Sequence, residues 1–217
     1  MLLLEGRKPI GFGGNRLCFR HPFVPGICVK VDRPDRTPKL RRASKAFPKN
    51  FLPVTHYDEN VVEARTLDYL HRAFPAPIRA HIPKSFGLLI TDLGTGHLIE
   101  LVSDESGEVS ENLEAYISGN GVDEAISAAI EEFKRNWSER TPRTRNLLPH
   151  NFVVQRRGHK LKLWLIDGFG RIPRTVALDL EVARKRLLNR RIAYFEDRIN
   201  RIQHGQRSRI QTSETSF

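Results

Sequence analysis

The stretch from Thr144 to Gly170 constrains the fold more than any other part of the sequence. It holds two short β-rich runs joined by a basic turn at Gly158, a pattern that predicts a β-hairpin. Asn151 stands just before the first run and Asp167 just after the second. An amide oxygen beside a carboxylate suits Mg²⁺ that also carries phosphate oxygens. Asn, Asp and Gly are equally the ordinary residues of turns, so this stretch alone leaves a plain turn as an alternative.

The composition is that of a folded protein with a sizeable core. Of 217 residues, 39% are hydrophobic and 28% are charged. The apolar start, Met1 to Leu4, meets Glu5 at once and is too short for a signal-peptide core. We therefore expect no membrane span and a cytoplasmic location. Cys18 and Cys28 are expected to be free thiols, and the net charge of +11 permits attraction to phosphates, nucleic acid or acidic partners without identifying one.

The first thirty residues predict a small sheet that contains a glycine-rich turn. Gly11, Gly13 and Gly14 can lay backbone N–H groups over phosphates, because glycine allows close approach. Lys30, in a following apolar strand, can reach the same phosphates as a point charge. Taken singly, each feature is explained as well by a plain glycine turn and by a lysine on the solvent face of an edge strand.

A helix is predicted from Glu59 to Phe74, because its apolar residues recur at helical spacing. Glu63 lies about one turn into this helix and is able to pair with Lys30, which would fix the ammonium for phosphate binding. The alternative is an acid that only decorates the first turn of a helix, where the dipole favours it.

The connection over residues 32–58 is polar and basic, and it is long for a loop. We expect part of it to be mobile or to form a short helix. Its Arg41, Arg42 and Lys45 suit nucleic acid, although a solvated loop is the simpler interpretation.

The rest of the chain is predicted to alternate strands and helices. Residues 78–102 read as strands around a hairpin turn, and the segment after Gly170 ends in a basic helix and a polar, disordered tail. The predicted helices cover residues 110–117, 122–137 and 179–203. The last of these, with its many arginines, makes nucleic acid a less favoured candidate partner.

In chain order the sequence gives a glycine-rich hairpin, a strand lysine, a helix glutamate, a long helix, an asparagine loop, a second hairpin and then Asp-Gly-Phe-Gly. This order resembles the protein kinase fold. More closely it is similar to the YrbL family of bacterial kinase-like proteins, named as PhoP regulatory network proteins. The resemblance spans roughly residues 10–200 and is carried by the segments 13–22, 28–31, 63–70, 91–96, 149–151 and 166–170.

The resemblance implies an α+β, protein kinase-like fold with two lobes. The expected parts are a small β-rich N-lobe over residues 1–104, a reduced and mainly helical C-lobe over residues 105–203, and a disordered tail over residues 204–217. It also implies ATP and Mg²⁺ as cofactors. Residues 101–104 would then lie near the adenine.

The implied site residues follow position by position. Lys30 would hold the α- and β-phosphates, oriented by Glu63, while the glycines at positions 11, 13 and 14 cover the phosphates. Asn151 and Asp167 would bind Mg²⁺. The nucleotide is therefore one expected partner, and the second is an acceptor, protein or small molecule, that the sequence does not identify.

Two departures from the kinase pattern bear on activity. Asn146 stands where kinases carry the catalytic aspartate, and an amide is no base for a substrate hydroxyl. Arg16 replaces the third glycine of the phosphate loop, where it puts the usual loop closure in doubt and offers its own contact to phosphate. The chain after Asp167 also lacks an Ala-Pro-Glu motif, so the platform for peptide substrates is expected to be reduced.

Three functions follow from these residues. The first is an ATP- and Mg²⁺-binding, kinase-like protein whose phosphotransfer relies on positioning around Asn146 and Asp167. The second is a catalytically inactive pseudokinase that acts as a regulatory binding module. The third is a nucleic-acid-binding protein that uses the basic region over residues 179–209.

Overall fold

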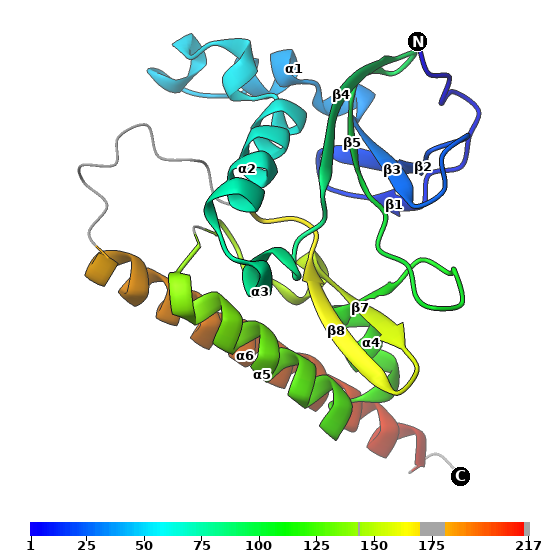
Figure 1. Cartoon of the computed structure of the whole chain (residues 1–217), viewed down its shortest axis with the longest axis vertical. Coiled ribbons are helices and arrows are strands. Elements are labelled where there is room, and N and C mark those ends of the chain that lie inside the picture. Colours follow the sequence, from blue (N-terminus) through cyan, green and yellow to red (C-terminus); the bar gives the residue numbers. More distant parts are fainter. Residues whose placement is uncertain (143, 170–180, 215–217) are drawn as a thin grey trace. The chain divides into compact units, whose positions relative to one another are not determined.

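The computed structural model describes residues 1–142, 144–169 and 181–214 of an α+β chain (Figure 1). The chain divides into two compact units. Unit 1 comprises Met1–Arg72 and Pro83–Leu101, and unit 2 comprises Ala73–Ile82 and Val102–Phe217. The predicted N-lobe had included the short segment 73–82, which the contacts assign to unit 2.

Unit 1 is built on an antiparallel five-stranded sheet of order β1-β2-β3-β5-β4 (Figure 1). Short apolar runs separated by turns form it, as the sequence predicted for the strands around Phe19 and Lys30. The strands are β1 (Gly11–Phe12), β2 (Arg16–Arg20), β3 (Ile27–Asp32), β4 (Ser85–Thr91) and β5 (Gly94–Glu100).

The two faces of this sheet differ in character. One face buries Phe19, Val29 and Val31 under the N-terminal segment, which contributes Leu2 and Leu4. That segment forms no named strand and joins the sheet through an isolated bridge from Leu2 to Thr91. The opposite face carries polar side chains and lies against helix α2 (Glu59–Ala73), which covers residues predicted to be helical.

The connection between β3 and α2 contains short helical turns, in agreement with the short helix that the sequence predicted there. They are η1 (Pro34–Arg36), α1 (Pro38–Ala43), η2 (Lys49–Phe51) and η3 (Val54–His56). Helix α1 begins after Thr37, whose side chain accepts a hydrogen bond from the backbone N–H of Leu40 and so caps the helix.

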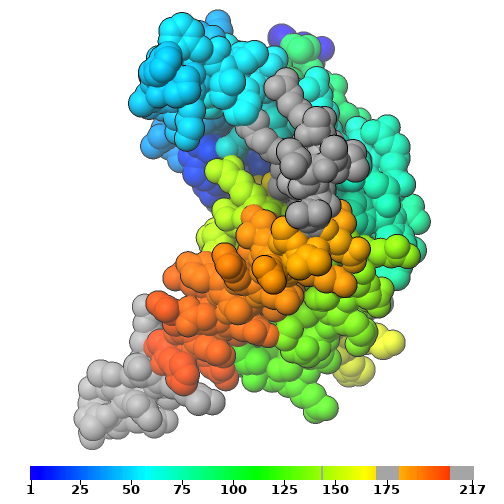
Figure 2. Space-filling model, turned by 90° about the vertical axis from the view of Figure 1, so that its left-hand side faces the viewer, coloured from blue at the N-terminus to red at the C-terminus, as the bar shows by residue number. Residues whose placement is uncertain are grey.

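Unit 2 packs helices against the β7–β8 hairpin. Phe133 of α5 (Glu124–Arg140) stacks on Trp137 and meets Phe152 edge to face, and Phe152 in turn packs on Phe195 of α6 (Glu181–Glu214). Helices α5 and α6 run side by side (Figures 1 and 2). The remaining elements are α3 (Ala76–Arg79), β6 (Glu111–Asn112), α4 (Leu113–Asn120), η4 (Pro149–Asn151), β7 (Phe152–Arg157) and β8 (Lys160–Leu165).

Three boundaries in unit 2 differ from the sequence prediction. The predicted helix starts were residues 110 and 122, whereas Asn112 caps α4 and Asp123 caps α5. Each of these side chains accepts a hydrogen bond from a backbone N–H three residues later, so the cap chemistry sets the start of the helix. Helix α6 ends at Glu214 and so extends beyond residue 204, where we had predicted a disordered tail to begin. Residues 215–217 of that tail lie outside the described residues.

Candidate functional site

The glycine-rich turn between β1 and β2 forms the first part of the site, in unit 1. Gly11 lies opposite Cys18, and the backbone N–H of Gly13 donates to the carbonyl oxygen of Arg16 at 2.8 Å. A Cβ at Gly13 would lie 3.3 Å from that same oxygen, whereas a Cβ at Gly14 would meet nothing within 4 Å. The turn is therefore closed at Gly13 and open at Gly14, where the backbone stays accessible to a ligand.

Lys30 projects from the polar face of the unit 1 sheet toward helix α2. Its Nζ lies 2.9 Å from Oε1 of Glu63, with the lysine side chain 12% exposed and the glutamate 6% exposed. The structure thus brings together the lysine and the helix glutamate that the sequence proposed as partners. Because both groups are largely removed from water, their attraction is much stronger than that of a surface pair.

Arg16 and His97 complete a buried cluster around the same carboxylate. The Arg16 guanidinium binds Oε2 of Glu63, and Nδ1 of His97 lies 3.4 Å from that oxygen. His97 also shares a 3.0 Å hydrogen bond with Ser85, from Nε2 to Oγ. Arg16, which the sequence suggested as a phosphate contact, thus has its guanidinium held against α2.

The cluster determines the charge of Glu63. Burial acts to raise the pKa of this carboxyl, but the neighbouring Arg16 and Lys30, with His97, outweigh burial and hold the pKa well below its ordinary value. Glu63 is therefore an anion at neutral pH. It is fixed by partners on β2, β3 and β5, which restricts the position of the Lys30 ammonium.

Sequence reasoning missed His97 and Ser85. The register places His97 directly opposite Lys30, since β3 pairs with β5 across a long stretch of chain. A histidine inside a predicted apolar strand was the available signal, but only strand pairing shows which face it shares.

A second group of candidate residues lies in unit 2, where the 144–151 loop meets the end of the hairpin. The backbone N–H groups of Arg145 and Asn146 donate to the carbonyl of Gly168 at 2.7 and 3.1 Å. The N–H of Ile166 donates to the carbonyl of Asn151 at 2.9 Å. These bonds bring together the three residues that the sequence singled out here, Asn146, Asn151 and Asp167.

Gly168 makes this close approach possible. Its φ is +80°, a left-handed conformation that glycine adopts without strain. A Cβ would stand 2.3 Å from the carbonyl oxygen of Asn146 and 2.7 Å from Nδ2 of Asn151. Any side chain at this position would push the 144–151 loop away from the segment that follows β8.

The side-chain oxygens of Asn151 and Asp167 are ligands of the kind that a magnesium ion binds. Nδ2 of Asn151 donates to the carbonyl of Asn146 at 3.4 Å, which leaves the amide oxygen as the available acceptor of this side chain. Asp167 is exposed, and its Oδ1 accepts a 2.6 Å hydrogen bond from the N–H of Gly168. Two hard oxygen donors suit Mg²⁺, which keeps several waters and needs few protein ligands. Within the described residues no group of three or more His, Cys, Asp or Glu side chains is placed to hold a metal.

Residues 101–104, expected near the adenine, include the point where the chain passes from unit 1 to unit 2. The Leu101 N–H donates to the carbonyl of Gly26, and the Ser103 carbonyl accepts from Nε2 of Gln155 at 2.8 Å. Oδ1 of Asp104 accepts from the Ser110 hydroxyl and from the Arg156 N–H. These residues are thus tied to their own units, and their contact with a base stays a prediction.

The candidate residues therefore form two sets. Unit 1 holds the glycine turn, Arg16, Lys30 and Glu63, and unit 2 holds Asn146, Asn151 and Asp167. Each set is ordered by hydrogen bonds inside its own unit.

Comparison with known proteins places the chain among relatives. A family model described as "PhoP regulatory network protein YrbL" matches residues 2–200. The YrbL protein of Escherichia coli (strain K12) is 25% identical over 162 residues, which cover 72% of this chain and 67% of that protein. The YrbL protein of Shigella flexneri matches with the same values.

Among solved structures, the fold resembles protein kinase domains. A mutant of the Mycobacterium tuberculosis PknI kinase domain aligns with a TM-score of 0.43 and 16% identity, covering 74% of this chain and 57% of that chain. A Rad53 chain in complex with AMP-PNP aligns with a TM-score of 0.45 and 14% identity, covering 83% of this chain and 42% of that chain. The chain thus spans about half the length of these solved kinases. Among the described residues, no helix combines the length and apolar character needed to cross a bilayer.

Proposed function

The chain belongs to the YrbL family of PhoP regulatory network proteins, and we propose that it binds ATP with Mg²⁺ as a kinase-like bacterial protein with an atypical catalytic loop. The observation that carries the proposal is the buried ion pair of Lys30 and Glu63, at 2.9 Å on the polar face of the unit 1 sheet. A largely buried lysine that a carboxylate orients is a preformed binding group for a polyphosphate.

In this proposal unit 1 holds the phosphates. Lys30 contacts the α- and β-phosphates, and the glycine turn covers them through its backbone. The N–H of Gly13 is already used inside the turn, so the backbone N–H of Gly14, at the open position, is the better hydrogen-bond donor to a phosphate. Arg16 contributes indirectly, because its contact with Glu63 keeps the carboxylate in place for Lys30.

Unit 2 supplies the metal ligands. The amide oxygen of Asn151 and the carboxylate of Asp167 would hold Mg²⁺. When bound, the ion would supply positive charge that offsets the negative charge of the phosphates. The proposal therefore assigns a role in nucleotide binding to residues of each unit.

Phosphotransfer is the finer part of the proposal. Asn146 offers no carboxylate to accept a proton from an acceptor hydroxyl, so transfer rests on positioning and on charge stabilisation. The backbone N–H of Asn146 donates to the carbonyl of Gly168, so Asn146 lies close to Asp167, the proposed metal ligand.

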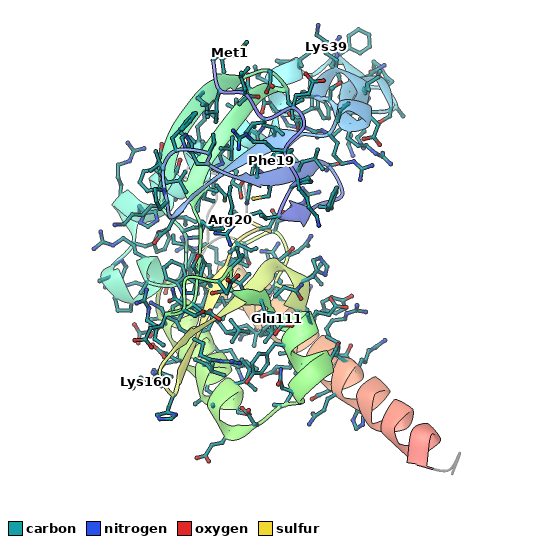
Figure 3. The ribbon with its side chains drawn as sticks, turned by 90° about the vertical axis from the view of Figure 1, so that its right-hand side faces the viewer. Met1, Phe19, Arg20, Lys39, Glu111 and Lys160 are labelled. Atoms are coloured by element: carbon teal, nitrogen blue, oxygen red, sulfur yellow. The ribbon has the colours of Figure 1, made fainter. Side chains whose placement is uncertain are left out.

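A thermal-shift experiment tests nucleotide binding. ATP with Mg²⁺ should raise the melting temperature of the wild type, and the shift should be lost in Lys30→Ala and in Asp167→Ala. Lys160→Ala is the matched control, because Lys160 is an exposed strand lysine at the tip of the β7–β8 hairpin (Figure 3). A shift that survives in both site variants would refute the proposal, as would its absence in the wild type.

Asn146 favours a second candidate, a pseudokinase that binds nucleotide and signals without transfer. Incubation with γ-labelled ATP separates the two functions. Labelled product that depends on Asp167 supports transfer. If the wild type forms none while Asn146→Asp does, the regulatory module is the better description.

A further inference from the structure

The connection between β3 and α2 combines positive charge with exposed aromatic side chains. Residues 36–57, which we call the basic-aromatic segment, contain six lysines and arginines and no aspartate or glutamate. The six cations are Arg36, Lys39, Arg41, Arg42, Lys45 and Lys49. This local excess of positive charge favours binding to an anionic partner.

The same segment exposes large apolar side chains. Phe47 is 79% exposed and Phe51 is 78% exposed, and Leu40 and Leu52 are also open to solvent. Helix α1, which carries Leu40, packs against η2, which carries Phe51. The segment lies at the surface of unit 1 (Figure 2, blue to cyan; Figure 3, at Lys39), so its exposed apolar side chains and its cations occur in the same part of that unit.

The segment is held in shape from beneath. Arg41 donates to the carbonyls of Tyr57 and Arg36 and pairs with Asp32 at 2.9 Å. The Tyr57 hydroxyl donates to the carbonyl of Lys49 at 2.6 Å. Because these contacts fix both ends, the segment presents its outer side chains without first having to fold, which lowers the entropic cost of binding.

Most of the outer cations keep their charge available. Arg41 is neutralised by Asp32, and Arg36 lies 3.9 Å from the exposed Asp35. The other four cations form no ion pair with any carboxylate in the described parts of the chain. They are Lys39, Arg42, Lys45 and Lys49.

We propose that the basic-aromatic segment docks the protein on an anionic lipid membrane. Phenylalanine and leucine side chains enter the boundary between headgroups and acyl chains, while lysine and arginine side chains meet anionic headgroups. Exposed apolar side chains and cations in the same segment match both layers of such a surface.

The ring geometry favours lipid over single-stranded nucleic acid. The rings of Phe47 and Phe51 meet edge to face, with centroids 5.9 Å apart and planes at 79°. Bases stack on open, parallel ring faces, and two rings at right angles give no continuous platform for them. Leu40 and Leu52 add apolar area that acyl chains accept and bases do not stack on.

The test is flotation of the full-length chain with vesicles. Vesicles of phosphatidylcholine with 30% phosphatidylglycerol should carry the protein, and pure phosphatidylcholine should not. Lys39→Gln combined with Lys45→Gln should weaken binding about 30-fold, since each basic residue near a charged surface contributes roughly a fivefold effect. Phe47→Ser combined with Phe51→Ser should weaken binding at least about tenfold.

Matched controls come from the same chain. Lys8→Gln with Lys160→Gln removes the same net charge from exposed sites outside the segment. Phe23→Ser removes a phenylalanine that is 78% exposed, as Phe51 is. Both controls should bind vesicles like the wild type.

Three results would overturn the proposal: no binding to the anionic vesicles, equal loss in the segment variants and their controls, or tight binding of a single-stranded RNA that only the segment variants lose, without vesicle binding. All altered side chains are exposed, so unchanged thermal unfolding is expected to show that the variants remain folded.

Discussion

The substitution Glu63→Gln tests most directly how much the buried cluster contributes to the free energy of unfolding. The substitution keeps the shape of the side chain but removes the negative charge that Arg16 and Lys30 share. Removing one partner of a buried ion pair costs about 3–5 kcal/mol, because the other charge stays buried without compensation. Two cations, 8% and 12% exposed, pair with the Glu63 carboxylate, so we expect a loss of at least about 3 kcal/mol.

Urea denaturation gives the measurement. Both tryptophans, Trp137 and Trp164, lie in unit 2, so their fluorescence reports that unit, while far-ultraviolet circular dichroism reports the whole chain. Glu59→Gln is the matched control: Glu59 lies one turn earlier in α2, is 32% exposed and stands 3.7 Å from Arg16. It should cost less than about 1 kcal/mol.

The comparison is decisive because helix, residue type and substitution are the same. If Glu63→Gln unfolds at the same urea concentration as Glu59→Gln, the buried cluster does not stabilise unit 1 and the reasoning is wrong. Lys30→Met should cost less than Glu63→Gln, because Arg16 still neutralises the carboxylate in that variant.

Three further predictions concern pH, Gly168 and a helix cap. The pKa of Glu63 is lowered in the folded state, so its contribution to stability is complete above the unfolded pKa of about 4.3 and is lost as pH falls toward the folded pKa. In urea titrations the wild type should therefore lose stability between about pH 5 and 3 more steeply than Glu63→Gln. Equal slopes for the two proteins would contradict this. Gly168→Ala should lower stability by at least about 2 kcal/mol in thermal unfolding, through its positive φ and the Asn146 carbonyl 2.3 Å from the new Cβ, whereas Gly119→Ala, in open helix surface, should be neutral or stabilising by up to about 1 kcal/mol. Asp123→Ala should cost about 1 kcal/mol in the same assay, since it removes the cap of α5, and an unchanged melting temperature would show that the cap is not needed.

Local features were predictable because they depend on residues close in sequence. The hairpin within 144–170 follows from two β-rich runs around a glycine turn, and α2 follows from apolar periodicity. The pairing of Lys30 with Glu63 was proposed from residue type and chain order, and the structure confirms that contact. It required no knowledge of strand register.

Features that depend on long-range register were not predictable. His97 reaches Glu63 only because β5 pairs with β3, and Arg16 turns toward α2 because β2 lies on the other side of β3.

The start of α5 was misjudged by two residues, since Val122 fits the apolar pattern while the Asp123 side chain caps the helix. The extent of α6 was underestimated, because helical geometry continues into a polar sequence with a weak apolar pattern.

The proposed nucleotide binding is tested most directly by isothermal titration calorimetry of ATP in the presence of Mg²⁺. We predict one site per chain, with binding lost both in Lys30→Met of unit 1 and in Asp167→Asn of unit 2. The absence of ATP binding to the wild type, or ATP binding that either substitution leaves unchanged, would contradict the account.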